Sequence, residues 1–173
     1  QELGQGLVPG DVVIDEALCD HPGEERVEIR REAGLEPDQD RVKEASGNLE
    51  QVSEIIRVTP KEFLVYSGDD SLTLPTLAVG GVGVISVAAH IVGNRMQEMI
   101  TAFFNNDIQT AQAIQSELIP FFKTMFITTN PIPVKTAVTL LGLNGGSFRL
   151  PLIPPTANEF EQIKNMMHRM KII

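Results

Sequence analysis

The sequence contains no tryptophan, one tyrosine and a single cysteine, Cys19. A lone cysteine excludes a disulfide within the chain, which is compatible with a reducing cytoplasm. No uninterrupted apolar stretch approaches the roughly 18 residues that a membrane-spanning helix needs. The first residues also lack the basic start and apolar run of a signal peptide. We therefore expect a soluble, cytoplasmic protein.

Clusters of lysine and arginine are also absent. The net charge is −9, and it is distributed unevenly along the chain. Residues 1–41 carry 12 acidic and 4 basic side chains, whereas residues 42–173 carry 11 and 10. Nucleic acids and anionic membranes both reward basic patches, so neither is an expected partner. The change in charge predicts a distinct acidic N-terminal segment over residues 1–41.

Signatures of cofactor and metal binding are missing too. In VGGVGVISV, residues 79–87, the glycines precede a predicted strand, whereas a dinucleotide fingerprint needs them after one. None of the three histidines has a second ligand at metal-binding spacing; they are His21, His90 and His168. The pair Asp69-Asp70 could supply two catalytic carboxylates, but its position favours N-caps of a helix. We expect neither a metal nor a cofactor.

What is present is an ordinary globular composition, with 173 residues of which 42% are hydrophobic. This length corresponds to about one domain. After residue 41 the pattern alternates strand, helix, strand, helix, strand, with Pro60 ending the first helix and Gly80-Gly81 the second. Such alternation is typical of βα units and a parallel sheet. The predicted strands lie at 42–45, 63–68 and 82–88, and further helices at 91–104, 107–126, 131–141 and 156–170.

The acidic segment has a weaker pattern. Alternating apolar residues on either side of Pro22-Gly23 favour a β-hairpin over residues 11–32. A disordered acidic arm is the alternative. The following AGLEPDQD, residues 33–40, is typical of a linker.

Lys43 is the residue with the clearest chemical potential. It lies at the end of a predicted strand in RVKEASGN, and ligand sites of parallel βα folds lie outside the carboxyl ends of the strands. Most lysines at strand ends are simply solvated. A lysine shielded from water, however, has a lowered pKa, and its neutral amine can form a Schiff base with a keto acid. We expect such shielding at Lys43.

Five segments together resemble the C-terminal half of the dihydrodipicolinate synthase family. They are KEASGNLEQVSEI, SGDDSLTLP, GGVGVISVAAHI, NPIPVKTAVTLLGL and RLPLIPP, and they occur in order from about Val42 to the C-terminus. N-acetylneuraminate lyases share the fold and the lysine, but the sequence motifs KEASGN and SGDD favour the synthase. The resemblance implies a class I aldolase-type lyase of lysine biosynthesis, in the diaminopimelate pathway. Its implied substrates are pyruvate and aspartate semialdehyde.

The resemblance also implies roles for three residues. Lys43 matches the lysine that forms the Schiff base with pyruvate. Ile85, in GVISV, matches the residue whose backbone lies beside bound pyruvate, and Gly68, in SGDD, matches a glycine that lines the pocket floor. Tyr66 does not match a catalytic tyrosine of the family.

The implied fold is α/β: a partial (β/α)8 barrel, comprising the last three βα units over residues 42–106, followed by a C-terminal helical bundle over 107–173. A complete barrel needs about 250 residues. The family's first five βα units have no counterpart in this sequence. The residues that these units supply in the family are therefore missing too: the threonines that bind the pyruvate carboxylate, the tyrosines of the proton relay, the arginine that binds the second substrate, and the lysine feedback site.

Three interpretations follow from the sequence. The chain is an active synthase-type lyase, a non-catalytic half-barrel that serves as a binding or assembly module, or a fragment of a longer enzyme. A three-stranded parallel sheet would expose apolar faces and two edges. We therefore expect a homo-oligomer in which the N-terminal segment packs on an open edge or exchanges across it.

Overall fold

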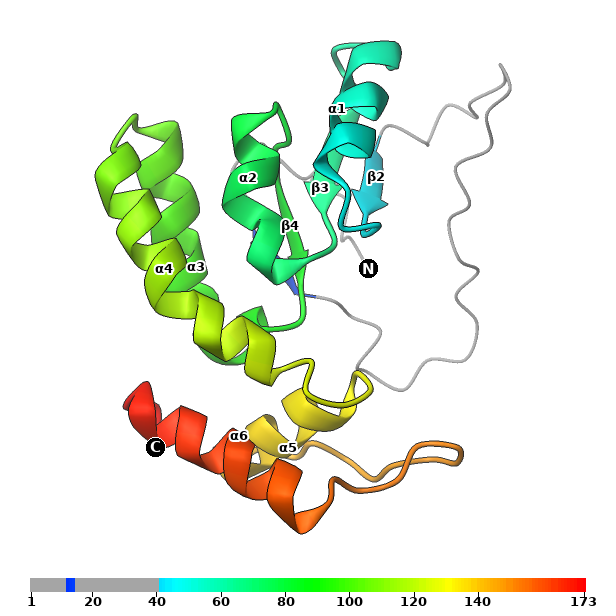
Figure 1. Cartoon of the computed structure of the whole chain (residues 1–173), viewed down its shortest axis with the longest axis vertical. Helices are drawn as coiled ribbons and strands as arrows, with labels where there is room; N and C mark the ends of the chain where they lie inside the picture. Colours follow the sequence, from blue (N-terminus) through cyan, green and yellow to red (C-terminus); the bar gives the residue numbers. More distant parts are fainter. Residues whose placement is uncertain (1–11, 15–40) are drawn as a thin grey trace, which may run out of the picture.

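The computed structural model describes residues 12–14 and 41–173 of the chain. Four parallel strands form one sheet in the order β1-β4-β3-β2. Their bounds are β1 Val12–Ile14, β2 Arg41–Glu44, β3 Leu64–Ser67 and β4 Gly83–Ser86. Strands β2, β3 and β4 follow one another along the chain, and the helices after them pack beside the sheet (Figure 1). The three predicted βα units are thus present.

Local sequence signals fix the ends of these units. Helix α1, Leu49–Val58, begins at Asn48, whose side chain accepts hydrogen bonds from the backbone N–H groups of Glu50 and Gln51. The strand β3 leads through a 3-10 turn, η2 (Asp70–Leu72), into the short helix α2, Thr73–Ala78. Gly80, at φ +110°, follows α2 and turns the chain into β4, because left-handed backbone is readily adopted only by glycine.

The rest of the chain is helical. Helix α3, Ala89–Phe104, completes the third βα unit and packs against α4, Ile108–Thr124, with Val92 interrupting the helical geometry of α3 near its start. The remaining helices are α5, Ile132–Leu140, and α6, Ala157–Arg169. In Figure 1 the last two lie across one end of the α3–α4 pair. The predicted helices agree with these bounds to within two residues.

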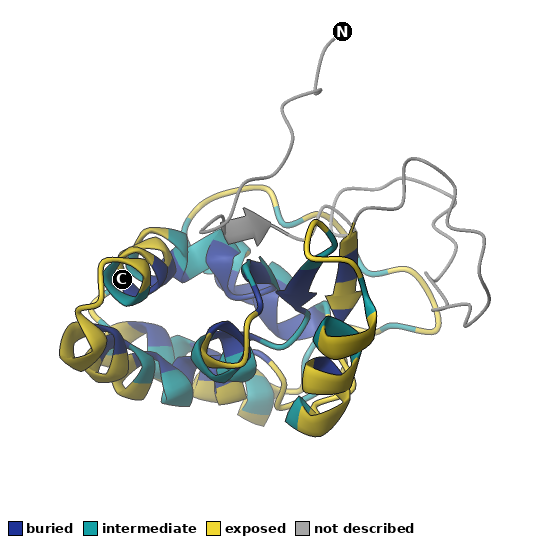
Figure 2. Cartoon of the chain, turned by 90° about the horizontal axis from the view of Figure 1, so that it is seen from above, coloured by how far each residue is buried: buried dark blue, intermediate teal, exposed yellow. Residues whose placement is uncertain are grey.

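Two groups of apolar side chains form the core. The smaller one lies between the sheet and α1 and contains Val42, Val52 and Val65. The larger one runs from Val84 of β4 through the four helices α3 to α6. Figure 2 shows this distribution: β3, β4 and the inner helix faces are largely buried, whereas β2 alternates exposed and buried residues and the outer helix faces are exposed. The last barrel-type unit and the bundle helices therefore share the larger core, and β2, β3 and α1 form the smaller one.

The N-terminal segment contributes one described element. β1 pairs in parallel with β4, with Val13 opposite Ile85. An open edge of the three-unit sheet is therefore covered within the same chain, as one of the two expected arrangements requires. The expected hairpin over residues 11–32 lies otherwise outside the described residues.

Candidate functional site

The sheet has two different faces near the carboxyl ends of its strands. Val42 and Glu44 of β2 are buried against the side that carries α1. Side chains alternate along a strand, so Lys43 points to the opposite face. The pairing register places Lys43 opposite Tyr66 and Tyr66 opposite Gly83, so Ile85, two residues further along β4, lies on that same face. The structure thus brings Lys43 and Ile85 to one face of the sheet, two strands apart.

Gly68 lies directly against Lys43. A β-carbon at Gly68 would lie 2.5 Å from the Cβ of Ala45 and 3.0 Å from the Cγ of Lys43. The backbone N–H of Gly68 also donates to the carbonyl oxygen of Glu44 at 2.6 Å. Only glycine therefore allows the end of β3 to approach the end of β2 so closely, and this approach supports the stem of the Lys43 side chain.

A buried carboxylate joins the ends of β3 and β4. Asp70 is 1% exposed, and its Oδ2 accepts a hydrogen bond of 2.9 Å from the backbone N–H of Ala88, immediately before α3. Burial raises the pKa of Asp70, and hydrogen bonds from Ser86 and Ala88 offset this effect only in part. The hydroxyl of Ser86 in turn accepts a hydrogen bond from the N–H of Ala89 at 2.9 Å. These contacts fix the backbone that follows Ile85.

The loop between β3 and α2 is held from two further sides. Asp69 accepts hydrogen bonds from the backbone N–H and the hydroxyl of Ser71, at 2.9 and 2.8 Å. Gln115 of α4 reaches the same loop and donates to the carbonyl oxygen of Ser71 at 2.7 Å. The bundle helix α4 therefore helps to position the loop that carries Gly68.

Asp69 and Asp70 stabilise two different elements. Asp69 is the N-cap of η2, as the sequence predicted. Asp70 instead serves the start of α3, 18 residues later in the chain. A sequence pattern identifies Asp70 as an acceptor, but it does not show that the donor is as far along the chain as Ala88. Nor does it show that Gln115 contacts this loop. Neither residue was identified from the sequence as supporting the site.

The structure contradicts the expected shielding of Lys43. The residue is exposed in the single chain. The physical reason is its position in β2, the last strand at one end of the described sheet, where no further βα unit covers it. Whatever excludes water from this amine is not supplied by residues 41–173.

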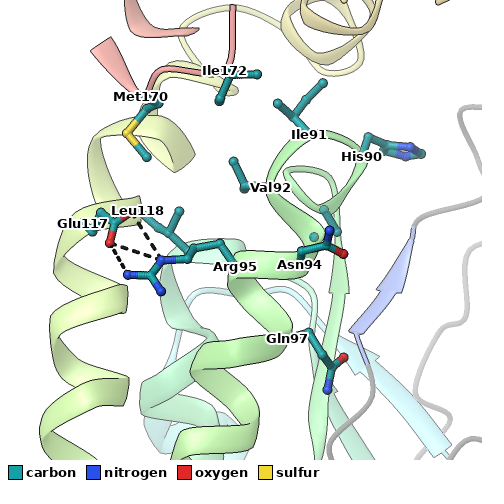
Figure 3. A pocket seen from close by; sticks show the side chains of 12 residues that line it. His90, Ile91, Val92, Asn94, Arg95, Gln97, Glu117, Leu118, Met170 and Ile172 are labelled. Atoms are coloured by element: carbon teal, nitrogen blue, oxygen red, sulfur yellow. Dashed lines mark hydrogen bonds and ion pairs between the residues drawn. The ribbon is translucent and has the colours of Figure 1, made fainter. Parts of the chain in front are cut away.

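A separate cavity lies between α3, α4 and the C-terminal residues Met170 and Ile172 (Figure 3). Its volume is about 630 Å³. Arg95 lies along one side and pairs with Glu117 at 2.6 Å, and the hydrogen bonds that it donates to the carboxylates of Glu117 and Glu98 raise the pKa of the guanidinium group. Because these carboxylates neutralise Arg95, the cavity offers no net positive charge to an anionic substrate.

His90, on the rim of this cavity, has a buried Nε2 without a hydrogen-bond partner in the described part of the chain. His168 contacts the carbonyl oxygen of Ile173 instead of a metal-binding neighbour. Within residues 12–14 and 41–173, no group of three or more His, Cys, Asp or Glu side chains could hold a metal ion. Nor is any helix there long and apolar enough to cross a membrane.

Comparison with known sequences gives a consistent result. Residues 39–170 match the sequence profile of the dihydrodipicolinate synthetase family. The 4-hydroxy-tetrahydrodipicolinate synthase of Cyanothece sp. is 52% identical over 132 residues, which are 76% of this chain and 45% of the relative. The enzyme of the same name from Moorella thermoacetica is 57% identical over 122 residues, 70% of this chain and 42% of the relative. The chain thus spans less than half the length of these curated relatives.

Solved structures show the same partial coverage. Dihydrodipicolinate synthase from Aquifex aeolicus superposes with a TM-score of 0.74 at 39% identity, over 76% of this chain and 45% of that one. The enzyme from Cyanidioschyzon merolae gives a TM-score of 0.75 at 43% identity, over 78% and 45%. The fold described above is therefore that of the C-terminal part of a (β/α)8 barrel enzyme with its helical extension.

Proposed function

Because this chain belongs to the dihydrodipicolinate synthetase family, we propose that it carries the carbonyl chemistry of a class I aldolase-type lyase, with Lys43 as the nucleophile. Pyruvate is the proposed first substrate and aspartate semialdehyde the second, in lysine biosynthesis. A cytoplasmic location fits this role.

One observation carries the proposal. Lys43 and Ile85 lie on one face of a parallel sheet, near the carboxyl ends of β2 and β4, and Gly68 supports the lysine stem. This end of the strands is where parallel βα folds bind their ligands. A small keto acid held beside Ile85 would present its carbonyl carbon to a nucleophile on the neighbouring strands.

The proposed reaction begins with the uncharged amine of Lys43. Its nitrogen attacks the keto carbon of pyruvate and forms a carbinolamine, and loss of water then gives an iminium ion. Removal of a methyl proton from this iminium gives an enamine, whose carbon attacks the aldehyde of the second substrate.

Borohydride trapping tests the first covalent step. The protein is incubated with pyruvate and reduced, so that hydride adds to the iminium carbon and leaves a stable secondary amine. We expect a mass gain of one pyruvate, less water and plus two hydrogens, on the peptide that contains Lys43. Lys43→Ala abolishes the adduct, whereas Lys61→Ala, which removes another exposed lysine, retains it.

The exposure of Lys43 favours a second candidate, a non-catalytic half-barrel that serves as an assembly module. A solvated amine is an ammonium ion at neutral pH and does not attack carbonyls. No adduct at Lys43 over the range from about pH 6 to 9 would support this candidate and exclude the first.

A further inference from the structure

The start of α3 lies where (β/α)8 barrel enzymes frequently bind phosphate. Strands β2, β3 and β4 are the last three strands of such a barrel, so β3 and β4 correspond to the seventh and the eighth. The loops after these two strands, together with a helix N-terminus, form the usual phosphate site. We propose that Asp70 is a specificity-determining residue that fills this position with its own carboxyl group and so excludes phosphorylated ligands. For the keto acid, this inference rests on the proposed function.

Asp70 occupies the first backbone donor at the start of this helix. Its Oδ2 accepts a hydrogen bond of 2.9 Å from the N–H of Ala88, the residue immediately before α3. The hydroxyl of Ser86 accepts the next one, from the N–H of Ala89, also at 2.9 Å. A phosphate at a helix N-terminus is held by donors of this kind. Both are engaged within the chain, so they are not available to a ligand.

The carboxyl group of Asp70 is fixed in this position. The residue is 1% exposed, and its backbone carbonyl accepts a hydrogen bond of 2.9 Å from the hydroxyl of Thr73. The next carbonyl, that of Ser71, accepts one of 2.7 Å from Gln115 of α4. Burial raises the pKa of Asp70, but the position stays filled in both protonation states, because a carboxylic acid also keeps an acceptor oxygen. A ligand would have to break several internal bonds to displace it.

The helices that follow β2 and β3 offer no alternative phosphate site. Asn48 accepts the backbone N–H groups of Glu50 and Gln51 at the start of α1. Asp69 accepts the N–H of Ser71 in η2 at 2.9 Å. The helical segments that begin at the carboxyl ends of β2, β3 and β4 are thus all capped by the chain's own side chains.

The loops after these strands also lack the basic side chains that balance a phosphate charge. Residues 45–48, 68–72 and 87–88 contain two aspartates and neither lysine nor arginine. The first arginine of α3, Arg95, is already paired with Glu117 at 2.6 Å. A phosphate dianion in these loops would therefore meet negative charge without a counter-charge. A keto acid with a single carboxylate is favoured over its phosphate ester.

Inorganic phosphate is the probe of the first experiment. Isothermal titration calorimetry measures its binding to the full chain, with chloride at matched ionic strength as the reference. Asp70→Gly removes the carboxyl group, frees the N–H of Ala88 and leaves room for an anion. We expect phosphate to bind this variant about tenfold more tightly than the wild type, because a charge-assisted hydrogen bond to the helix start becomes possible.

Two matched variants separate occupation of the helix start from charge. Asp70→Asn removes the charge but retains an oxygen for the N–H of Ala88, and Asp69→Asn removes the neighbouring charge and retains the cap of η2. Neither is expected to gain phosphate binding, and a gain in either would show that charge alone excludes the anion. If circular dichroism shows that Asp70→Gly is unfolded, Ser86→Ala frees the N–H of Ala89 and tests the same position.

The second experiment compares two keto acids that differ only by a phosphate group, hydroxypyruvate and its phosphate ester. The start of α3 follows Ile85 closely along the chain, so the ester places its phosphate on a ligand held beside this helix start. Borohydride trapping on Lys43 is measured with each acid. We expect the wild type to trap the ester about tenfold more slowly than hydroxypyruvate, and Asp70→Gly to reduce this ratio.

The outcomes separate this inference from the proposed chemistry. A wild type that traps neither keto acid, while Asp70→Gly gains phosphate binding, excludes the lyase function and supports the role of Asp70. A wild type that binds phosphate as tightly as the variants, or traps both acids equally, overturns that role. So does a folded Asp70→Gly or Ser86→Ala that binds phosphate no better than the wild type.

Discussion

Gly68 is the residue whose size the site depends on most directly. A β-carbon there would lie 2.5 Å from the Cβ of Ala45 and 3.1 Å from the carbonyl oxygen of Glu44. We expect Gly68→Ala to force β2 and β3 apart, to lower the free energy of unfolding by about 1–3 kcal/mol, and to reduce pyruvate trapping on Lys43.

Gly93 provides the matched control. An added β-carbon meets only the Cβ of Ala89, at an ordinary 3.7 Å, and the residue lies within α3. Gly93→Ala should therefore be neutral or stabilise the protein by up to about 1 kcal/mol. Urea denaturation of both variants measures the difference. Equal stability of the two would show that the close approach at Gly68 carries no constraint.

Asp70 gives the site a predictable dependence on pH. Its pKa in the folded protein is raised because the carboxyl is buried. The folded state therefore holds its proton more tightly than the unfolded state, so its contribution to stability is complete at acidic pH, below the unfolded pKa. That contribution is lost as the pH rises through the raised folded value.

The amide in Asp70→Asn does not titrate, yet it can still accept the hydrogen bond from Ala88. The wild type should therefore lose stability relative to Asp70→Asn as the pH rises from about 4, the ordinary pKa of aspartate, towards neutral pH. Denaturation curves at several pH values in that range measure the difference. Parallel stability profiles for the two proteins would contradict the effect of burial.

At the level of elements, α6 depends on its first turn. Thr156 accepts a hydrogen bond from the N–H of Glu159, and the Glu159 carboxylate accepts one from the N–H of Thr156. The N–H and the hydroxyl of Thr156 both donate to the Glu159 carboxylate and lower its pKa. Thr156→Ala should lower the free energy of unfolding by about 1 kcal/mol. Thr156→Ser retains the oxygen and serves as the control. If both variants are equally stable, the cap does not contribute.

The sequence predicted the elements better than their connections. Periodicity and breakers such as Pro60 located every helix from α1 to α6, because those signals are local. Asn48 caps α1, but its own N–H donates to the hydroxyl of Ser46, and the side-chain amide of Gln51 donates to Glu44 at 3.4 Å. That partner lies in β2, and only the folded chain brings it within reach.

The candidate site shows the same difference between local sequence signals and contacts that form only in the folded chain. The family motifs identified Lys43, Gly68 and Ile85 as candidate site residues. The strand pairing then placed Lys43 and Ile85 on one face of the sheet. The exposure of Lys43 could not be predicted, because it depends on what lies beside β2 and not on β2 itself. The contact from Asp70 to Ala88 was missed for a related reason, since it joins two loops from different βα units.

At the scale of the whole molecule, the shared core has a consequence for unfolding. The larger apolar group joins β4 to all of the helices from α3 to α6 without a gap. Loss of the helical bundle would therefore expose the apolar side of β4. We expect the sheet and the bundle to unfold in a single cooperative transition.

Tyr66 makes this expectation measurable, because the chain has one tyrosine and no tryptophan. It is buried in β3, so its fluorescence reports on the sheet, whereas far-ultraviolet circular dichroism reports mainly on the helices. The two denaturation curves should coincide. Phe121→Ala, a truncation at a fully buried site in α4, should shift both together by about 3–5 kcal/mol. A shift in the dichroism curve alone would show that the bundle unfolds separately from the strands, and the position of Lys43 would then not depend on α4 to α6.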